Sequence, residues 1–445
     1  MKRCRDFLLP SRAGWVASFR NPTHWRGKCW IGTASPTVGA LGDRTTTDKS
    51  RRLSRLKARR KLWLEIHLWL GLIAGAVLLI VGLTGSILVF WQEIDTALNP
   101  ALHQVQVPPE GRAVYQPLSE IVSTADAAMP PGAKRSTFYY PRYEGLAFWF
   151  FYEAPSAMPE HPDTLNVFVN PYTAQVTGTR VWSSADSIFK HCFMAFIFEL
   201  HYDLLLGWDG GSWIVGVIGI LAFKSVLTGL IIWWPLTGKW RQALTIKRRA
   251  STERLNFDLH KTVGFYSAIV LLTVLISGIY FNFGEQFRWL VDCFSVTAPV
   301  GSFKSEALPG LAPISLDEAM ARADIDYPEG QLYWFTVPND AEGVYVLTRH
   351  IDFGGIFRGR RQIVMDQYTG RILYVADPLA GKGGNVFLQW QWPLHSGQAM
   401  RMLGRILVLL AGIACATLFV TGVIRWLQKR RVRSKAVRRI KCRAD

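Results

Sequence analysis

Cysteine is scarce in this sequence and follows no pattern. Six cysteines are spread over 445 residues, with no Cys-x-x-Cys pair and no spacing typical of a metal site. They are Cys4, Cys29, Cys192, Cys293, Cys415 and Cys442. This scarcity argues against a disulfide framework, so we expect incidental thiols, with a Cys192–Cys293 bridge as the weaker alternative.

The glycine-rich motifs of nucleotide enzymes are also missing. No Gly-x-Gly-x-x-Gly follows a predicted strand, and there is no phosphate-binding loop of the Walker type. The polar segments beside the basic clusters are too short to form a flavin or nicotinamide domain. If electrons pass through this protein, we therefore expect their donor to be another molecule.

Acidic residues are in deficit as well. The chain has 33 of them against 51 Lys and Arg, which gives a formal net charge of +18. A basic protein can bind nucleic acid, but these basic residues form three clusters, each beside an apolar run, which is typical of membrane topology. We expect a lipid bilayer, and no nucleic acid, among the partners.

Apolar sequence, by contrast, is abundant. Hydrophobic residues make up 49% of the chain, and the mean hydropathy is +0.13. Four runs reach the roughly 20 residues that cross a bilayer as a helix, at residues 66–91, 213–234, 263–283 and 403–427. We predict an α-helical membrane protein with four transmembrane helices.

The basic clusters orient these helices. Residues 49–61 hold eight Lys and Arg, the loop 236–262 holds seven, and nine follow residue 427. Cytoplasmic segments carry this excess, so both termini and the loop are predicted to be cytoplasmic. Residues 92–212 and 284–402, where acids outnumber bases, then face the other side of the membrane, which in a Gram-negative cell is the periplasm.

Both outer segments have the pattern of a small α+β module. In each, a stretch with helical spacing precedes aromatic and β-branched stretches broken by Gly, Pro and Asn. The first has "QPLSEIVSTADAAMP", then "STFYYPRY", "GLAFWFFYE" and "LNVFVNPYTAQVTG". The second has "APISLDEAMARADIDYP", then "QLYWFTV", "EGVYVLTRH" and "RQIVMDQYTGRIL". We predict a helix followed by strands in each.

The two halves of the chain repeat one another, which predicts a tandem duplication of span, outer module and span. The matched positions, offset by 193 or 194 residues, include His67 and His260, Gly85 and Gly278, Gly229 and Gly422, and His201 and His395. Each of these glycines follows a Thr or Ser. Both halves have the same orientation, so a pseudo-two-fold axis along the membrane normal is expected.

These elements give the predicted order along the chain. The order is a disordered cytoplasmic tail (1–54), first span (55–92), first outer module (93–189), interfacial helix with second span (190–235), basic cytoplasmic loop (236–259), third span (260–284), second outer module (285–394), fourth span (395–428) and basic cytoplasmic tail (429–445).

Four of the nine histidines stand beside the spans at repeat-related positions: His67, His260, His201 and His395. The 18 residues from His67 to Gly85 cover roughly 27 Å of helix, so His67 and His260 lie near the cytoplasmic face. The other two precede the second and fourth spans and lie near the outer face. Pseudo-symmetry brings each couple together, and two facing imidazoles are the ligand set of six-coordinate haem. Two haem groups at opposite depths are predicted, with interfacial anchors or satisfied polar groups as the alternative.

Other residues have plainer interpretations. His191 has no repeat mate and is only an alternative outer ligand. We expect four histidines to be ordinary surface residues: His24, His103, His161 and His350. Four glycines are expected to allow close helix packing, with clearance for a porphyrin edge as the second possibility: Gly85, Gly229, Gly278 and Gly422. Five aromatic residues are expected in the strand core, with a chelate-lining role as the alternative: Tyr139, Tyr140, Trp149, Trp334 and Phe335.

Several stretches carry a family resemblance. They are "RKLWLEIHLWLGLIAGAVLLIVGLTGSILVFWQEID", "LHYDLLLG", "LTGLIIWWP" and "DLHKTVGFYSAIVLLTVLISG". Together they resemble the PepSY-associated transmembrane proteins, often described as iron-regulated membrane proteins. The outer modules then resemble PepSY domains, with "VNPYTAQVTG" and "MDQYTGRIL" as hairpins. The resemblance covers roughly residues 55–430, and the first 50 residues lie outside it.

The resemblance implies a multi-pass inner-membrane protein with two periplasmic PepSY modules. Some members are haem-containing reductases that release iron from ferric siderophores, so it implies two b-type haems held by the four span histidines. The donor would be an unidentified cytoplasmic or membrane molecule, and the substrate a ferric siderophore or similar Fe(III)-chelate. The alternative is a non-redox, membrane-anchored protein whose PepSY modules regulate a peptidase or a transporter.

Overall fold

The computed structural model describes residues 39–444, apart from residues 157, 159, 160, 236, 237, 239, 248, 299, 308 and 309. The chain divides into two units, Met1–Ala58 and Arg59–Asp445, and the features discussed below lie in the second. Of the tail predicted at residues 1–54, residues 1–38 lie outside the described part. Residues 39–54, for which the sequence predicts disorder, belong to helix α1 (Gly39–Leu88). No Gly or Pro interrupts residues 43–70, which explains the helix.

Four long helices carry the predicted spans. The apolar spans are Ala58–Leu88 in α1, Gly210–Trp233 in α6 (Trp208–Trp233), Thr252–Asn282 in α8 (Thr252–Asn282) and Gln398–Val432, which includes most of the apolar part of α12 (Arg401–Ala444). Each is long and apolar enough to cross a bilayer, which confirms the four helices predicted from hydropathy.

Two boundaries differ from those predicted. Helix α8 starts inside the predicted loop at 236–259, because the Ser251 side chain accepts a hydrogen bond from the Arg254 N–H and caps the helix. Helix α12 continues to Ala444, so the basic tail predicted at 429–445 is a helical extension over its described residues. Its Lys and Arg are good helix formers.

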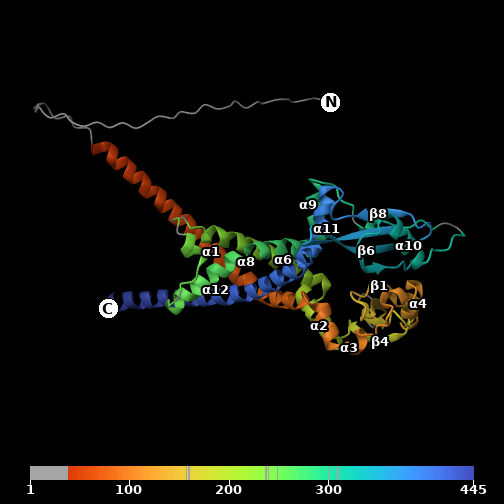
Figure 1. Cartoon of the computed structure of the whole chain (residues 1–445). Helices are drawn as coiled ribbons and strands as arrows, with labels where there is room; N and C mark the ends of the chain where they lie inside the picture. The colour runs from red at the N-terminus through yellow and green to blue at the C-terminus, as the bar shows by residue number, and fades with distance from the viewer. Residues whose placement is uncertain are drawn as a thin grey trace, which may run out of the picture. The chain divides into compact units, whose positions relative to one another are not determined.

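The spanning helices lie side by side (Figure 1). Helices α1 and α12 make a close contact, because a Cβ on Gly412 would lie 2.2 Å from the Gly82 carbonyl oxygen. The Ser86 hydroxyl donates to the Leu409 carbonyl at 2.9 Å across the same contact. Beside it lies a small buried cluster: Leu271, Ala411 and Cys415. Small residues thus let the two backbones touch.

The outer segments share one sheet of eight antiparallel strands, in the order β4-β3-β2-β1-β5-β6-β7-β8. The strands are β1 (Lys134–Tyr139), β2 (Phe148–Ala154), β3 (Asp163–Val169), β4 (Val176–Ser183), β5 (Gln331–Thr336), β6 (Val344–Phe353), β7 (Phe357–Asp366) and β8 (Ile372–Ala376). The sequence predicts two modules but not their union. Strands β1 and β5 join them, with Phe138 opposite Phe335 and Tyr139 opposite Trp334. Pairing satisfies N–H and C=O groups that each module alone would leave open at its edge.

Helices α4 (Leu118–Ala127) and α10 (Leu316–Asp326) pack against one face of this sheet. The core of this face includes fully buried side chains from both modules: Phe138, Phe150, Phe335, Leu347 and Ile363. The predicted helix of each module is therefore confirmed, as is the strand-core interpretation of Phe335. Trp149 is also buried, in a second cluster with Phe168 and Ala147.

Short helices connect the sheet to the spans. They are α2 (Trp91–Leu98), α3 (Pro100–His103), α5 (Phe193–Tyr202), α9 (Gly284–Asp292) and α11 (Gly383–His395), with α7 (Trp240–Leu244) between α6 and α8. Short 3₁₀ helices cover Gly111–Val114, Ile188–Lys190, Val300–Ser302 and Gln398–Met400. Helices α5 and α11 end shortly before α6 and α12, which brings His201 and His395 to the ends of those spans.

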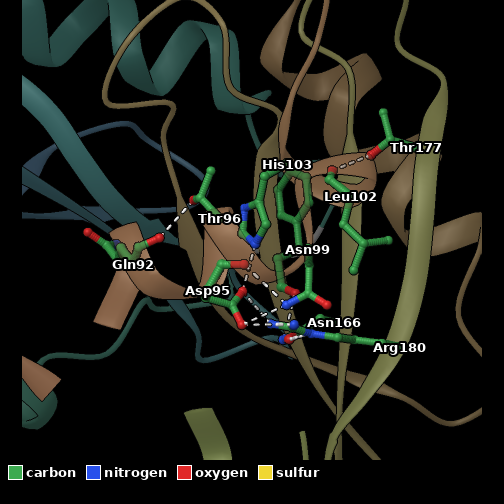
Figure 2. A network of polar contacts seen from close by, with 10 residues as sticks. Gln92, Asp95, Thr96, Asn99, Leu102, His103, Asn166, Thr177 and Arg180 are labelled. Carbon is green, nitrogen blue, oxygen red and sulfur yellow. Dashed lines mark hydrogen bonds and ion pairs between the residues drawn. The ribbon is translucent and has the colours of Figure 1, made fainter. Parts of the chain in front are cut away.

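His103 is buried, not a surface residue, which corrects the prediction. Its side chain is 4% exposed, and Nε2 lies 2.6 Å from Asp95 Oδ2. Arg180 donates to both oxygens of the same carboxylate, at 3.0 and 2.8 Å (Figure 2). A buried carboxylate needs such donors. The sequence around His103 does not predict this burial, because Arg180, which donates to the same carboxylate, comes from the distant strand β4.

Candidate functional site

The four repeat-related histidines form two pairs. The ring centroids of His67 in α1 and His260 in α8 lie 6.2 Å apart, with 79° between the ring planes. Those of His201 at the end of α5 and His395 at the end of α11 also lie 6.2 Å apart, at 65°. Each pair therefore joins a residue from the first half of the chain to one from the second. We call them the inner pair (His67 and His260) and the outer pair (His201 and His395).

In the inner pair, a facing helix binds Nδ1 of each ring. His67 Nδ1 lies 3.0 Å from the Ser225 carbonyl oxygen and 3.2 Å from the Thr228 hydroxyl, both on α6. His260 Nδ1 lies 2.9 Å from the Thr421 hydroxyl on α12. The carbonyl can only accept, so Nδ1 of His67 donates and its Nε2 keeps a free lone pair.

The outer pair repeats this arrangement. His201 Nδ1 lies 2.8 Å from the Val81 carbonyl oxygen on α1, and His395 Nδ1 lies 3.1 Å from the Val274 carbonyl oxygen on α8. Hydroxyls three residues further along those helices lie 3.2 and 2.9 Å from the same nitrogens: Thr84 and Ser277. Both rings therefore donate through Nδ1 and leave the Nε2 lone pair available.

A glycine on the facing helix lies against Cε1 of each imidazole. The distances from an added Cβ to Cε1 are 2.8 Å for Gly85 with His201, 3.1 Å for Gly229 with His67, 3.4 Å for Gly278 with His395 and 3.5 Å for Gly422 with His260. The Thr or Ser that contacts Nδ1 directly precedes each glycine. These glycines make room for an imidazole, whereas the sequence predicts close helix packing, a role that Gly82 and Gly412 have instead.

The two pairs lie at different depths along the bundle. Helix α1 shows this directly, because His67 belongs to the inner pair and Val81 contacts the outer pair. The 14 residues between them correspond to about 21 Å of α-helix. The pairs are therefore separated by a large part of a bilayer's apolar thickness.

His191 is held away from the outer pair. Its Nδ1 accepts from the Ser184 N–H at 3.1 Å, and its Nε2 lies 2.8 Å from the Glu199 carboxylate. Both ring nitrogens have protein partners, so the geometry favours His201 as the outer residue. His161 is exposed, and His24 lies outside the described residues.

Two surface cavities lie on the sheet. One of about 430 Å³ opens on the face covered by α4 and α10, and its lining includes Arg112, Tyr140 and Asp317. The other, of about 380 Å³, is lined in part by His350 and Arg358. The first is the larger of the two and lies on the sheet face that α4 and α10 cover.

In the described part of the chain, no three His, Cys, Asp or Glu side chains gather to hold one metal ion. Cys192, Cys293 and Cys415 are free thiols. The alternative of a Cys192–Cys293 bridge is therefore wrong, and the thiol interpretation is confirmed for these three.

A family model of the PepSY-associated transmembrane region matches residues 64–429. The chain belongs to the PepSY-associated transmembrane family. The match includes all four paired histidines and the whole eight-stranded sheet, so it confirms the resemblance seen in the sequence. A comparison with curated proteins gives no match.

Proposed function

We propose that this PepSY-associated transmembrane protein is a dihaem electron-transfer protein of the bacterial inner membrane. It reduces a ferric siderophore or a similar Fe(III)-chelate in the periplasm. The observation that carries the proposal is the fourfold arrangement of a histidine whose Nδ1 is bound by a facing helix and whose Nε2 is not.

The separation within each pair suits a porphyrin iron. A metal–imidazole bond of about 2 Å on each side, plus about 1 Å from nitrogen to ring centre, gives roughly 6 Å between centroids. Both pairs have 6.2 Å. A hydrogen bond from the other ring nitrogen fixes the orientation of a metal-binding histidine. The residues therefore fit b-type haem, with His67 and His260 as one ligand set and His201 and His395 as the other.

The chain's own residues prepare the ligands. Bound haem would supply one-electron oxidation and reduction at each pair. The Ser225 carbonyl and Thr228 hydroxyl hold the His67 ring, and equivalent groups on α1, α8 and α12 hold the other three. Apolar span residues keep water away from the rings, which favours the neutral imidazole that binds iron. Two pairs about 21 Å apart give the bundle an entry side and an exit side for electrons.

The proposal includes a tandem duplication with both termini in the cytoplasm. In each half, the histidine of the first span contacts the second span, and the histidine before the second span contacts the first. Each pair joins one histidine from each half. The strand order is also mirrored about the β1–β5 junction. The orientation is supported by the excess of Lys and Arg on the side of the inner pair.

The proposed substrate depends on the side of the membrane on which the outer pair lies. Helices α5 and α11, which carry the outer pair, come directly from the sheet. An Fe(III)-chelate that reaches this side would accept one electron, and Fe(II) binds hard oxygen ligands less tightly than Fe(III), so the iron is released. The electron donor is a separate molecule on the cytoplasmic side or in the membrane.

The test is the visible spectrum of the purified full chain before and after dithionite. We expect two low-spin haems per chain in the wild type, and one in either His260→Ala or His395→Ala. His161→Ala is the matched control, because His161 is exposed and remote from the spans, and it should keep both.

A colourless protein from haem-replete cells would contradict the proposal. The same result would favour the non-redox alternative, in which the PepSY modules bind a peptidase or a transporter and the spans act as anchors. In that case the four histidines would be dispensable for whatever partner the modules bind, which a pull-down with the quadruple alanine variant would establish.

A further inference from the structure

A partly buried arginine with no carboxylate partner among the described residues lies close to the outer pair. Arg360 of β7 has its guanidinium carbon 5.3 Å from the centre of the Trp392 ring. Trp392 lies in α11 one helical turn before His395, and residues three apart on a helix are neighbours on its surface. Phe281 also bridges the two, at 5.8 Å from Trp392 and 5.2 Å from His395.

Three buried nitrogen atoms around this arginine have no hydrogen-bond partner in the described part of the chain: Arg360 Nε, Trp392 Nε1 and His350 Nε2. His350 lies directly opposite Arg360 in the β6–β7 register. Its ring stacks on Tyr333 at 4.1 Å, which fixes its position. The Gln398 amide, whose Oε1 is also buried and unpartnered, is the neighbour of His350. Buried donors are nearly always satisfied, so Arg360 Nε and Trp392 Nε1 are the two atoms that indicate a missing acceptor.

Neighbouring arginines contrast with Arg360. Three of them have carboxylate partners in the structure: Arg358 with Asp352, Arg361 with Asp377, and Arg405 with Glu93. Arg360 has none among the described residues, and tyrosines are the groups that face it. Burial lowers the pKa of Arg360 to about 10, which reflects a cation without a counter-charge. Burial and the nearby cations Arg358 and Arg360 lower the pKa of His350 to about 3, so this imidazole is neutral.

We propose that Arg360, Trp392 and His350 form a carboxylate-binding subsite beside the outer pair. The carboxylate is a propionate of the porphyrin that the outer pair holds, so this inference rests on the proposed function. Arg360 supplies charge and an N–H, Trp392 supplies an indole N–H, and His350 lines the subsite from the facing strand.

A second source of the same chemistry is a carboxylate of the ferric chelate. It would approach through the cavity of about 380 Å³ that His350 and Arg358 help to line. That cavity is also lined by Glu329 and Asp352, whose carboxylates pair with Arg361 and with Arg358 and Arg401, so its charged groups already have partners of opposite sign. The three unpartnered atoms are moreover shielded from solvent. Both facts favour the cofactor's propionate over the chelate.

The test compares binding of haemin and of haemin dimethyl ester, in which both propionates are blocked. Full-length protein from haem-limited cells is titrated as wild type, Arg360→Gln, Arg360→Lys and Trp392→Phe. Arg358→Gln is the control, because it removes a guanidinium two residues away that already has a carboxylate partner. All variants are first compared by size-exclusion chromatography and circular dichroism.

We expect Arg360→Gln to weaken the second haemin equivalent by about tenfold to a hundredfold, the range for a lost charged hydrogen bond. Arg360→Lys should restore part of the affinity, and Trp392→Phe, which keeps a ring but loses the N–H, should cause a smaller loss. The dimethyl ester should bind wild type and Arg360→Gln equally. The midpoint potential of the outer haem should fall in Arg360→Gln, because a nearby cation stabilises the reduced form.

The chelate is tested in parallel with ferric citrate and a neutral ferric trihydroxamate. If Arg360→Gln weakens only ferric citrate, the carboxylate belongs to the substrate. If neither haemin nor ferric citrate is affected, the subsite is overturned, while two haems in the wild type would still support the proposed function. If the wild type binds no haemin, the proposed function fails and the ferric citrate comparison alone decides the subsite.

Discussion

At the scale of single residues, the site depends on a Thr or Ser followed by Gly. The hydroxyl reaches Nδ1 of a histidine on the facing helix, and the glycine leaves space for Cε1. Neither residue carries redox chemistry. Their effect is to fix one rotamer and one tautomer of each imidazole, which a metal ligand requires.

Gly85→Ala tests this role. The new Cβ would lie 2.8 Å from Cε1 of His201, so the ring must move, and we expect loss of the outer haem with the inner one kept. Gly71→Ala on the same helix is the control, because its Cβ would meet only the Ser225 hydroxyl oxygen, at 3.9 Å. Both changes raise helix propensity alike. Two haems in Gly85→Ala, measured by absorbance per chain, would contradict this role.

The buried Asp95 controls the stability of the first half of the sheet. Burial alone would raise its pKa, but hydrogen bonds from His103 and Arg180 outweigh burial and hold the pKa below its usual value. Asp95→Asn should cost about 3–5 kcal/mol, as for one lost partner of a buried ion pair. Hydrogen exchange in β3 and β4 measures this loss of stability. Asp186→Asn is the control and should change the exchange little, because Asp186 forms an exposed pair with Lys190.

The same carboxylate gives a pH dependence with a definite sign. Because the folded pKa of Asp95 is lowered, its stabilising effect is complete above the unfolded value of about 4 and is lost as the pH falls through the folded pKa. We expect exchange protection in β3 and β4 to fall in strong acid for the wild type. Asp95→Asn should not show this acid-dependent loss of protection. The same acid profile in both proteins would contradict the attribution to Asp95.

At the scale of elements, the two modules stabilise one another. Helix α4 starts after Pro117, whose side chain offers no cap. Asp317 of α10 supplies it, with its carboxylate accepting from the Leu118 N–H at 2.7 Å and the Ser119 N–H at 3.1 Å. The cap and the β1–β5 pairing both cross between modules, so neither module is complete alone.

Asp317→Ala should therefore loosen α4, a helix nearly 200 residues away in sequence. The expected cost is about 1 kcal/mol, the usual value for a lost helix cap, and it should appear as faster exchange in the first turn of α4. Glu318→Ala is the control, because the ion pair of Glu318 is with Arg322 on its own helix. Equal effects on α4 from the two variants would argue against the cap.

At the scale of the whole molecule, one junction ties the sheet to the bundle. Glu93 of α2 accepts from Arg405 of α12, at 2.8 Å, and from Arg142, which follows β1, at 2.8 Å. Burial alone would raise the pKa of Glu93, but the two arginines hold it below its usual value. Arg405 also donates to the Val89 carbonyl near the end of the first span. The outer pair thus lies beside a cross-linked boundary between sheet and membrane helices.

The orientation of the molecule can be tested with a native thiol. Cys293 is exposed and follows α9 on the side of the sheet, so an impermeant maleimide should label it in intact spheroplasts. Cys293→Ser should remove most of that signal, because Cys192, the other thiol on this side, is only partly exposed. Cys415 is buried, and Cys4, Cys29 and Cys442 should react only after the membrane is opened. Labelling of Cys293 only after permeabilisation would reverse the proposed topology.

Local signals explain how much of the site the sequence predicts. His67 and His260 are found because hydropathy locates the spans and the repeat aligns the two residues. The Thr–Gly and Ser–Gly pairs are visible in the same alignment, but their contact with imidazole is not, because it forms between helices more than 100 residues apart. Arg360 appears as one of several arginines in a strand, and only its surroundings distinguish it.

The sequence by itself determined four membrane spans, a repeated order of elements and four histidines at matched positions, because hydrophobicity and spacing are properties of the local chain. Only the tertiary structure decided that the histidines meet in two pairs at 6.2 Å, that both modules form one sheet, and that His103 and the Nε atom of Arg360 are buried. Burial and pairing depend on which distant segments pack together, and packing is a property of the whole fold.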